Sequence, residues 1–274
     1  MKVLVTGANG MLGQDLCPML EDAGYDVIET DINNLDITDE KQTMAKISEI
    51  KPQILIHCAA YTNVDKAEED KETAYLINVK GTENIAKACE QNEITMVYIS
   101  TDYVFDGKSQ KQYTPADVPN PINNYGLNKL DGEKAVQNNC SKYYITRTSW
   151  LYGHHGKNFV ETMISIASNK EVKVVDDQTG CPTWTVDLAE AIIKILEDKK
   201  EYGIYHTCGK GYTTWYGFAK EIYQKAGLKV NLQPCKTSEF PRAAQRPEFS
   251  AMDNDNLLRD WKKALNDYIE LRVD

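Results

Sequence analysis

A tyrosine and a lysine stand four residues apart in the run YGLNK, at Tyr125 and Lys129. On a helix, side chains four residues apart lie on the same face. A tyrosine ordinarily titrates near pH 10, and a neighbouring ammonium group stabilises its phenolate and lowers its pKa toward the neutral range. The spacing predicts a helix whose tyrosine exchanges a proton with a substrate. Because this spacing also arises by chance, the pair needs support from other residues.

Thr101 supplies that support, because it directly follows the apolar run Met96–Ser100, which is typical of a buried strand. In a doubly wound sheet the carboxyl ends of the strands line the ligand crevice. Thr101 is therefore expected to donate a hydrogen bond to a carbonyl that Tyr125 protonates, so that both donors stabilise the developing alkoxide. Thr101, Tyr125 and Lys129 form the predicted catalytic set.

Three glycines, Gly7, Gly10 and Gly13, stand between an apolar strand pattern over Lys2–Thr6 and a helical pattern over Met11–Ala23. This arrangement is typical of a dinucleotide-binding loop, in which the backbone approaches a pyrophosphate at a helix N-terminus. Gly7 is expected to permit the turn out of the strand, Gly10 the approach of the phosphates, and Gly13 close packing of the helix on the sheet. A glycine triplet alone is a weak signal, and its place at the start of a βα unit strengthens it.

Asp31 ends the second predicted strand, Asp26–Thr30, about 20 residues past the loop, where an acidic side chain bonds the adenosine ribose. No Lys or Arg lies between Gly13 and Lys41 to receive a 2′-phosphate. The sequence therefore favours NADH, with NADPH also possible, although Asp31 is also a residue that turns commonly use. Asp36 and Ile37 are placed to flank the adenine, and Asp36 is equally suited to cap the next helix.

Strand and helix patterns alternate through the first 150 residues, which predicts an α/β, Rossmann-type doubly wound parallel sheet. Residues 1–150 are assigned to a dinucleotide-binding domain, and residues 151–274 mainly to a smaller C-terminal substrate-binding lobe, with some later segments returning to the sheet. Further strands are predicted at Ile54–Cys58, Tyr143–Arg147, Val172–Val175 and Ile204–Cys208; helices at Ala74–Asn92, Asn124–Asn139, Phe159–Asn169, Thr185–Glu197, Thr214–Ala226 and Asn254–Leu271; and irregular chain at Gln233–Pro247.

Composition narrows the class of partner. The 274 residues carry a formal net charge of -10, which disfavours binding to nucleic acid or to an anionic membrane. The seven cysteines are odd in number and form no C-x-x-C pair, which indicates buried free thiols. The opening residues MKVLVTG read as a strand rather than a signal peptide, and no apolar run is long enough to cross a bilayer, so a cytoplasmic protein is expected.

Seven runs make the chain resemble the dTDP-4-dehydrorhamnose reductase family of extended short-chain dehydrogenases/reductases: VTGANGMLG, CAAYTNVDKAEED, YISTDYVFDG, NNYGLNKLDGE, RTSWLYG, DDQTGCPT and RPEFS. They extend from residue 3 to about residue 250. The glycine loop and Y-x-x-x-K occur throughout the superfamily, whereas STDYVFDG, RTSWLYG and DQTGCPT are more specific. The resemblance implies NAD(P)H-dependent reduction of the 4-keto group of dTDP-4-dehydro-L-rhamnose to dTDP-L-rhamnose.

The resemblance also implies roles for individual residues. Thr101, Tyr125 and Lys129 would be catalytic, with Tyr125 the proton donor, and Asn78 would lie behind the active site. A nucleotide-sugar substrate would be contacted by Thr101, Asp102 and Trp150. The cofactor would be contacted by Gly10, Met11, Leu12, Asp31, Asp36, Ile37, Ala59, Ala60 and Tyr61, with Thr62 and Val64 nearby.

Two arginines in the proline-rich segment, Arg242 and Arg246, are candidates to bind the diphosphate, because a guanidinium group pairs with two oxygens at once. They are equally well explained as surface residues. Some family members hold Mg²⁺ at a dimer interface through carboxylates. Asp15 matches one of these carboxylates, but Val186 stands where another is expected, which disfavours the metal and leaves a monomer or a homodimer open. The segment from 251 to 260 is short for the family.

Two other readings remain. The chain could be another nucleotide-sugar reductase or an epimerase, which would show no net consumption of NADH. It could also be a non-catalytic cofactor-binding subunit, as the regulatory subunit of methionine adenosyltransferase resembles the same family. The intact set of Thr101, Tyr125 and Lys129 favours an enzyme.

Overall fold

A computed structural model of the chain describes residues 1–272 and contains a central sheet of six parallel strands. The strands lie in the order β10 (Gly203–His206), β5 (Tyr143–Thr148), β4 (Thr95–Thr101), β3 (Ile54–His57), β1 (Lys2–Thr6), β2 (Asp26–Thr30). β1 pairs with β2 on one side and with β3 on the other. After β2 the chain therefore crosses over β1, and the later strands are added in sequence on the other side of β1. This confirms the predicted α/β, doubly wound architecture.

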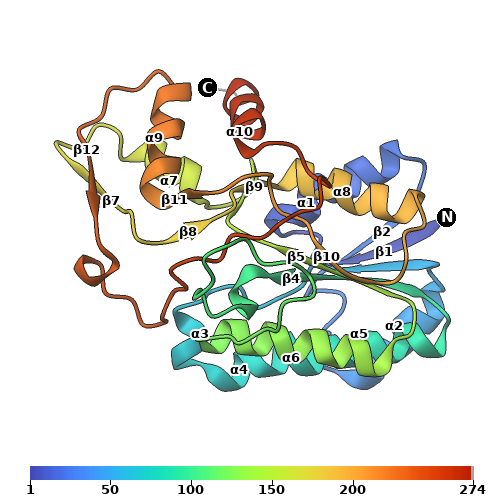
Figure 1. Cartoon of the computed structure of the whole chain (residues 1–274). Coiled ribbons are helices and arrows are strands. Elements are labelled where there is room, and N and C mark those ends of the chain that lie inside the picture. The colour runs from blue at the N-terminus through green and yellow to red at the C-terminus, as the bar shows by residue number, and fades with distance from the viewer. Residues whose placement is uncertain (273–274) are drawn as a thin grey trace.

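Helices cover both faces of the sheet (Figure 1). One face carries α1 (Met11–Asp22) and α8 (Thr185–Glu197), and the other carries α2 (Glu40–Ile50), α5 (Thr82–Gln91) and α6 (Asn124–Asn139). Successive β1 residues are buried on opposite faces, with Val3 and Val5 in the α1/α8 cluster and Leu4 in the other cluster. The sheet is therefore buried on both sides, which explains why its strands read as continuous apolar runs.

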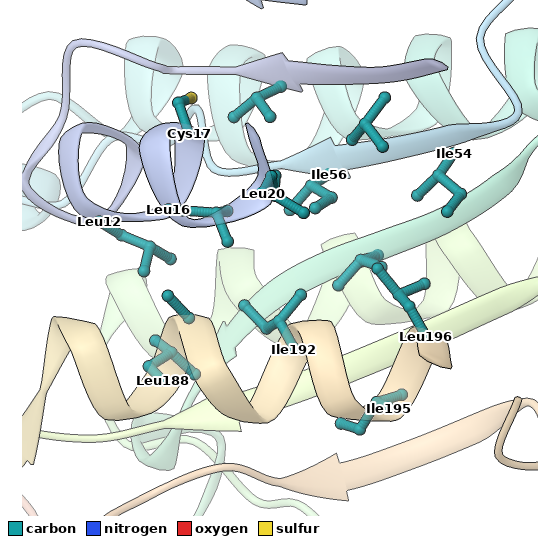
Figure 2. Close-up of a cluster of buried hydrophobic side chains, with 14 of the residues drawn as sticks. Leu12, Leu16, Cys17, Leu20, Ile54, Ile56, Leu188, Ile192, Ile195 and Leu196 are labelled. Carbon is teal, nitrogen blue, oxygen red and sulfur yellow. The ribbon is translucent and has the colours of Figure 1, made fainter. Parts of the chain in front are cut away.

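The α1/α8 layer follows from helical spacing of apolar residues. Leu12, Leu16 and Leu20 recur every four residues on α1, and Leu188 and Ile192 do so on α8. Figure 2 shows these side chains converging in one cluster beneath β3. The cluster fixes α1, and thereby the glycine loop that precedes it, against the sheet.

The C-terminal lobe packs around its own apolar cluster, which includes Phe218, Trp261 and Tyr268. Two later elements, α8 and β10, belong to the central sheet layers rather than to the lobe. The lobe contains α7 (Phe159–Ser165), α9 (Trp215–Lys225), α10 (Trp261–Glu270) and three strand pairs: β7 (Val172–Val175) with β12 (Leu232–Cys235), β8 (Thr179–Gly180) with β11 (Thr213–Thr214), and β6 (Leu151–Tyr152) with β9 (Thr183–Trp184).

Several predicted boundaries are wrong. The long helix expected at Ala74–Asn92 is instead α4 (Lys71–Tyr75), a π-helical turn over Leu76–Gly81, and α5. The last helix begins at Trp261, because the preceding residues include two at positive φ and Asp260 caps the helix. The helix begun at Phe159 ends at Ser165, and the segment expected to be irregular contains β12 and a 3₁₀ turn, Thr237–Glu239.

Local capping defines where two important helices begin. Asn123 accepts a hydrogen bond from the Gly126 amide and so starts α6 just before Tyr125. Asp39 caps α2, which shows that the alternative of Asp36 as its cap is wrong. Two short elements complete the sheet domain, α3 (Lys66–Glu69) and the 3₁₀ turn Asp102–Val104. No helix within residues 1–272 has the length and apolar character needed to span a membrane.

Candidate active site

A cavity of about 630 Å³ opens at the carboxyl ends of the parallel strands, at the point in the sheet where β1 lies between β2 and β3. A ligand crevice is expected at this position in a doubly wound sheet. The structure brings most of the predicted site residues to its walls: Gly7, Gly10, Met11, Leu12, Gly13, Asp31, Asp36, Ile37, Ala59, Ala60, Thr101, Asp102, Tyr125, Lys129 and Trp150. Tyr61, Asn78, Arg242 and Arg246 do not line this cavity.

The glycine loop has the backbone geometry that its sequence predicts. Gly7 has a φ of +68°, and a Cβ at this position would lie 2.6 Å from the Ala59 amide nitrogen, so only glycine fits. A Cβ at Gly13 would collide with the Ala8 backbone, so this glycine accommodates the loop itself rather than a strand. The α1 N-terminus has neither a capping side chain nor an acidic residue in its first turn. Its free amides therefore suit the phosphates of a dinucleotide.

Asp31 lies at the rim of the cavity and is held by the backbone. Its Oδ2 accepts a hydrogen bond from the Asn9 amide at 3.1 Å, and its Oδ1 accepts one from the Ile32 amide at 2.8 Å. The carboxylate is therefore fixed beside the glycine loop. Beyond it, the lining includes the apolar side chains of Leu35 and Ile37, which suit a planar base.

Asn78 acts on the loop after β3 rather than on the cavity wall. The Tyr61 amide donates to Asn78 Oδ1 at 2.8 Å, and Asn78 Nδ2 donates to the Tyr61 carbonyl at 3.0 Å. This pair of bonds anchors the segment that carries Ala59 and Ala60 to the π-helical turn. The sequence did not predict this turn, and such turns are frequent at functional sites.

Thr101 ends β4 and caps the 3₁₀ turn that follows. Its oxygen accepts from the Tyr103 amide at 3.2 Å, and its hydroxyl donates to Asp102 Oδ1 at 3.1 Å. Asp102 is 2% exposed, and Ser250 Oγ donates to its Oδ2 at 2.5 Å. Burial raises the pKa of Asp102 to about 7, against the opposing effect of these hydroxyl and backbone donors.

Tyr125 approaches Thr101 because α6 lies unusually close to the 3₁₀ turn. A Cβ at Gly126 would fall 2.1 Å from the Tyr103 carbonyl oxygen, so glycine is required for this approach. Burial raises the pKa of Tyr125 to about 12, and the nearby Asp102 carboxylate adds to the rise, while Thr101 opposes it. The expectation that the folded chain lowers the pKa of this tyrosine is therefore wrong.

Lys129, the expected source of a lowered tyrosine pKa, lies one turn further along α6. Its side chain is buried, and its Nζ lies 4.2 Å from the centroid of the Tyr98 ring. Burial lowers the pKa of Lys129 to about 7, with Glu133 acting in the opposite direction. A lysine that titrates near neutrality is only partly charged there, so it stabilises a phenolate less than a fully charged ammonium would.

A buried ion pair fixes α6 to the two strands beside it. Glu133, one helical turn after Lys129, accepts hydrogen bonds from Arg147 Nε at 2.9 Å and Arg147 Nη2 at 2.7 Å. Ser100 Oγ donates to the same carboxylate at 2.5 Å. Because Ser100 precedes Thr101 and Arg147 lies on β5, these bonds set the position of the lysine and tyrosine relative to the threonine.

Trp150 is held in a strained conformation at the end of β5. Its φ is +46°, and its ring stacks on Trp215 with centroids 3.5 Å apart. Trp215 and Tyr103 line both the main cavity and a second cavity of about 490 Å³, so these two residues form part of the wall between them. Strain of this kind is common at binding sites.

Arg242 and Arg246 lie in the second cavity, apart from the other predicted substrate-binding residues. Arg246 Nη1 donates to Asp65 Oδ1 at 2.7 Å, and Nη2 donates to Oδ2 at 2.9 Å. This bidentate pair ties the C-terminal segment to the loop before α3 and lowers the pKa of Asp65. Arg242 is exposed, whereas Arg246 is partly buried and pairs with Asp65. The guanidinium group of Arg242 is therefore more accessible to an anion.

Sequence reasoning missed several cavity residues, among them Tyr103, Ser149 and Trp215. Tyr103 and Ser149 follow β4 and β5 closely, so the rule that strand ends line the crevice could have found them. Trp215 packs against the apolar cluster of the lobe, and tertiary packing also brings it to both cavities, a position that no local sequence signal predicts.

Asp15, the residue that matches a metal-binding carboxylate of some family members, contacts two other side chains of the protein. Asp15 accepts a hydrogen bond from Thr185 Oγ1, and its Oδ1 lies 3.3 Å from His155 Nε2. Across residues 1–272, no group of three or more His, Cys, Asp or Glu side chains is arranged to hold a metal ion. All seven cysteines have free thiols, and six of them are buried.

The sheet topology, the glycine loop and the convergence of Thr101, Tyr125 and Lys129 define the class, which is that of nicotinamide-dependent oxidoreductases of the extended short-chain dehydrogenase/reductase type. Comparison with known proteins then narrows it. The family model described as "RmlD substrate binding domain" matches residues 1–272. The chain therefore belongs to the RmlD family, that of the dTDP-4-dehydrorhamnose reductases.

Several known proteins are similar in sequence to this chain over nearly their whole length. The spore coat polysaccharide biosynthesis protein SpsK of Bacillus subtilis is 39% identical, covering 99% of this chain and 98% of the relative. The dTDP-4-dehydrorhamnose reductase of Escherichia coli is 35% identical, covering 98% of this chain and 94% of that enzyme. A crystal structure of the Bacillus anthracis dTDP-4-dehydrorhamnose reductase in complex with NADP has 42% identity and a TM-score of 0.95, with 99% of each chain covered.

Proposed function

We propose that the protein reduces the 4-keto group of dTDP-4-dehydro-L-rhamnose to give dTDP-L-rhamnose, with a nicotinamide cofactor in the main cavity. The observation that carries this proposal is the meeting of Thr101, Tyr125 and Lys129 on the wall of the cavity that the glycine loop also lines. The similarity to reductases named for this substrate supports the choice of sugar.

The residues that line the cavity support the binding of a dinucleotide along its length. The uncapped α1 N-terminus suits the pyrophosphate, Asp31 suits the adenosine ribose, and the apolar residues beyond it suit the adenine. When bound, the reduced nicotinamide supplies the hydride that the reaction consumes. Lys129 would hold the nicotinamide ribose, and Ala59 and Ala60 would follow the dinucleotide along the end of β3.

In the proposed mechanism, Tyr125 is the proton donor to the carbonyl oxygen and Thr101 is the second hydrogen-bond donor to it. Both side chains are preorganised, Thr101 by the Tyr103 amide and Tyr125 by the close approach of α6. A pKa of about 12 keeps Tyr125 protonated before the reaction, as a proton donor requires. Protonation of Lys129 would stabilise the phenolate formed when that proton leaves.

We propose that NADH is preferred over NADPH, because a 2′-phosphate would approach the Asp31 carboxylate. The 42% identical relative forms a complex with NADP, so the preference is expected to be partial. Measuring kcat/KM with each cofactor tests it, and a higher value with NADPH would contradict the proposal.

We assign the nucleotide half of the substrate to the second cavity, which adjoins the catalytic one at Tyr103 and Trp215. Arg242 is the proposed partner of the diphosphate, and Arg246 contributes by holding the segment in place through Asp65. Asp102 and Trp150 would contact the sugar between the two cavities.

The direct experiment follows the loss of nicotinamide absorbance when the protein is mixed with dTDP-4-dehydro-L-rhamnose, with the product identified by mass spectrometry and NMR. Tyr125→Phe serves as the catalytic control, and Tyr75→Phe, at an exposed tyrosine that does not line the cavity, serves as the matched control. Net oxidation of the cofactor by the natural protein and by Tyr75→Phe, with loss in Tyr125→Phe, is the expected result. No oxidation with either NADH or NADPH would overturn the assignment.

A second candidate is reduction of a different dTDP-linked 4-keto sugar. The dTDP-4-keto-6-deoxy-D-glucose reductase of Streptomyces niveus is 37% identical over 96% of this chain, about as similar as the rhamnose-forming relatives. Comparing kcat/KM for the two epimeric sugars separates these functions. An epimerase would interconvert sugars without net loss of NADH.

A further inference from the structure

The Thr101 hydroxyl has its single hydrogen committed to Asp102. A threonine hydroxyl carries one hydrogen and two lone pairs. One lone pair accepts from the Tyr103 amide at 3.2 Å, and the hydrogen is donated to Asp102 Oδ1 at 3.1 Å. In this arrangement Thr101 has no hydrogen left to donate to a substrate carbonyl, although the proposed function requires that donation.

Asp102 is enclosed, and a residue from the far end of the chain contacts it. Ser250 Oγ donates to Asp102 Oδ2 at 2.5 Å. Ser250 belongs to an extended segment, residues 248–253, which crosses from the lobe to the sheet domain. The Ser250 amide donates to the Thr179 carbonyl at 2.8 Å, and the Tyr113 amide donates to the Ala251 carbonyl at 2.9 Å. The segment therefore holds Ser250 firmly against the carboxyl group.

Within residues 1–272, no cationic group is among those that favour the ionised form of Asp102. The groups that favour its ionised form are hydroxyls and backbone amides. The titratable side chains that face it are Tyr103 on the same 3₁₀ turn, Tyr125 on α6 and Cys208 after β10. Burial raises the pKa of Tyr103 and of Tyr125, and the Cys181 side chain together with burial raises the pKa of Cys208. Because these three are neutral near pH 7, the ionised carboxyl depends on its hydrogen-bond donors alone.

We propose that Asp102 is a positioning residue that directs the Thr101 hydroxyl, and that Ser250 controls it. When Asp102 binds a proton from solvent on Oδ1, it becomes the donor to Thr101 Oγ1, and the Thr101 hydrogen is released toward the substrate carbonyl. Ser250 keeps Oδ2 as an acceptor, which leaves Oδ1 as the oxygen that takes the proton. In this step an O–H bond forms on Asp102 Oδ1 as the solvent donor loses its proton, and no other covalent bond changes. The inference rests on the proposed carbonyl reduction.

The pH dependence follows with a definite sign. The protonated form of Asp102 supports catalysis, so activity falls as the pH rises through its pKa of about 7. Ser250 favours the ionised form, and its removal raises the pKa of Asp102 and moves that fall to higher pH. Lys129 also titrates near this pH, but it does not hydrogen-bond with Ser250, so a change at Ser250 isolates the contribution of Asp102.

The test compares Ser250→Ala and Asp102→Asn with the natural protein in profiles of kcat against pH. Ser141→Ala is the matched control, because Ser141 Oγ also donates to a carboxylate, Glu90 Oε2, at 2.8 Å, but on the surface. The alkaline fall in kcat is expected to move up by about one pH unit in Ser250→Ala, corresponding to a tenfold change in proton affinity. Asp102→Asn, which offers a permanent amide donor, is expected to lose the Asp102-dependent part of the fall.

A second measurement needs no substrate. Carbon-13 NMR of the natural protein with labelled aspartate is expected to show one carboxyl resonance that titrates near pH 7, disappears in Asp102→Asn and titrates higher in Ser250→Ala. Titration of Asp102 below pH 5, or an alkaline fall that stays in place in both variants, would overturn the inference. If the natural protein reduces no keto sugar, the proposed function fails, and the NMR titration still decides the protonation of Asp102.

Discussion

Replacing Lys129 by methionine is expected to stabilise the fold at neutral pH while removing catalytic activity. Lys129 is 3% exposed, and burial lowers its pKa from 10.5 to about 7. The folded protein therefore binds this proton less readily than the unfolded chain does. The resulting loss of stability grows as the pH falls from 10.5 to about 7 and is constant below that range.

The magnitude follows from the two pKa values. A tenfold difference in proton affinity is worth about 1.4 kcal/mol, so the cost of burying Lys129 is on the order of 5 kcal/mol at or below pH 7. Methionine keeps most of the apolar stem but loses the contact between Nζ and the Tyr98 ring, which is worth about 1–2 kcal/mol. We therefore expect the free energy of unfolding of Lys129→Met to exceed that of the natural protein by roughly 2–4 kcal/mol at pH 7.

Urea unfolding followed by circular dichroism between pH 6.5 and pH 10 measures this difference. Lys134→Met is the matched control, because Lys134 lies on the same helix with a side chain that is 56% exposed, and its change is expected to stay within about 0.5 kcal/mol. The gain in Lys129→Met should shrink as the pH rises toward 10. A variant that is less stable than the natural protein at pH 7, or a gain that does not vary with pH, would refute the reasoning.

Three further changes test other parts of the structure. Glu133→Gln leaves Arg147 as an unpaired buried charge and is expected to cost about 3–5 kcal/mol of unfolding free energy, measured by urea denaturation. Gly126→Ala places a Cβ against the Tyr103 carbonyl, so kcat is expected to fall at least tenfold in the reductase assay, with a loss of about 1–3 kcal/mol in stability. Asp31→Ala removes the carboxylate from the ribose site, and the ratio of kcat/KM for NADPH to that for NADH is expected to rise at least tenfold in steady-state assays.

For each of these three predictions, one experimental result would contradict it. Asp131→Asn, which changes a partly exposed carboxylate on α6, controls for Glu133→Gln, and equal stability losses in both variants would show that the buried ion pair makes no specific contribution. Full activity in Gly126→Ala would show that the close approach of α6 to the 3₁₀ turn is dispensable. An unchanged cofactor ratio in Asp31→Ala would remove Asp31 from the recognition of the ribose.

The parts of the site that local sequence predicts are those that one strand end or one helix turn determines. Gly7 and Asp31 each follow a strand directly, Thr101 is the last residue of one, and Tyr125 and Lys129 share one turn of α6. All five line the main cavity, as the strand-end rule and the helical period predict. The same rules explain why the sheet and its two helical layers were predicted correctly.

The remaining features depend on contacts between distant segments. Ser250 reaches Asp102 across 148 positions of sequence, and Arg246 reaches Asp65 across 181, so no local pattern encodes either contact. The pKa of Tyr125 was misjudged because spacing shows which side chains are neighbours but not how deeply both are buried.

The most direct test of the central claim uses NADH labelled with deuterium at the transferred position of the nicotinamide, together with dTDP-4-dehydro-L-rhamnose. The account predicts that the natural protein yields dTDP-L-rhamnose with deuterium at C4 of the sugar, and that Tyr125→Phe forms this product at least a hundredfold more slowly. Cofactor binding without transfer of the label, or transfer at an undiminished rate in Tyr125→Phe, would contradict it.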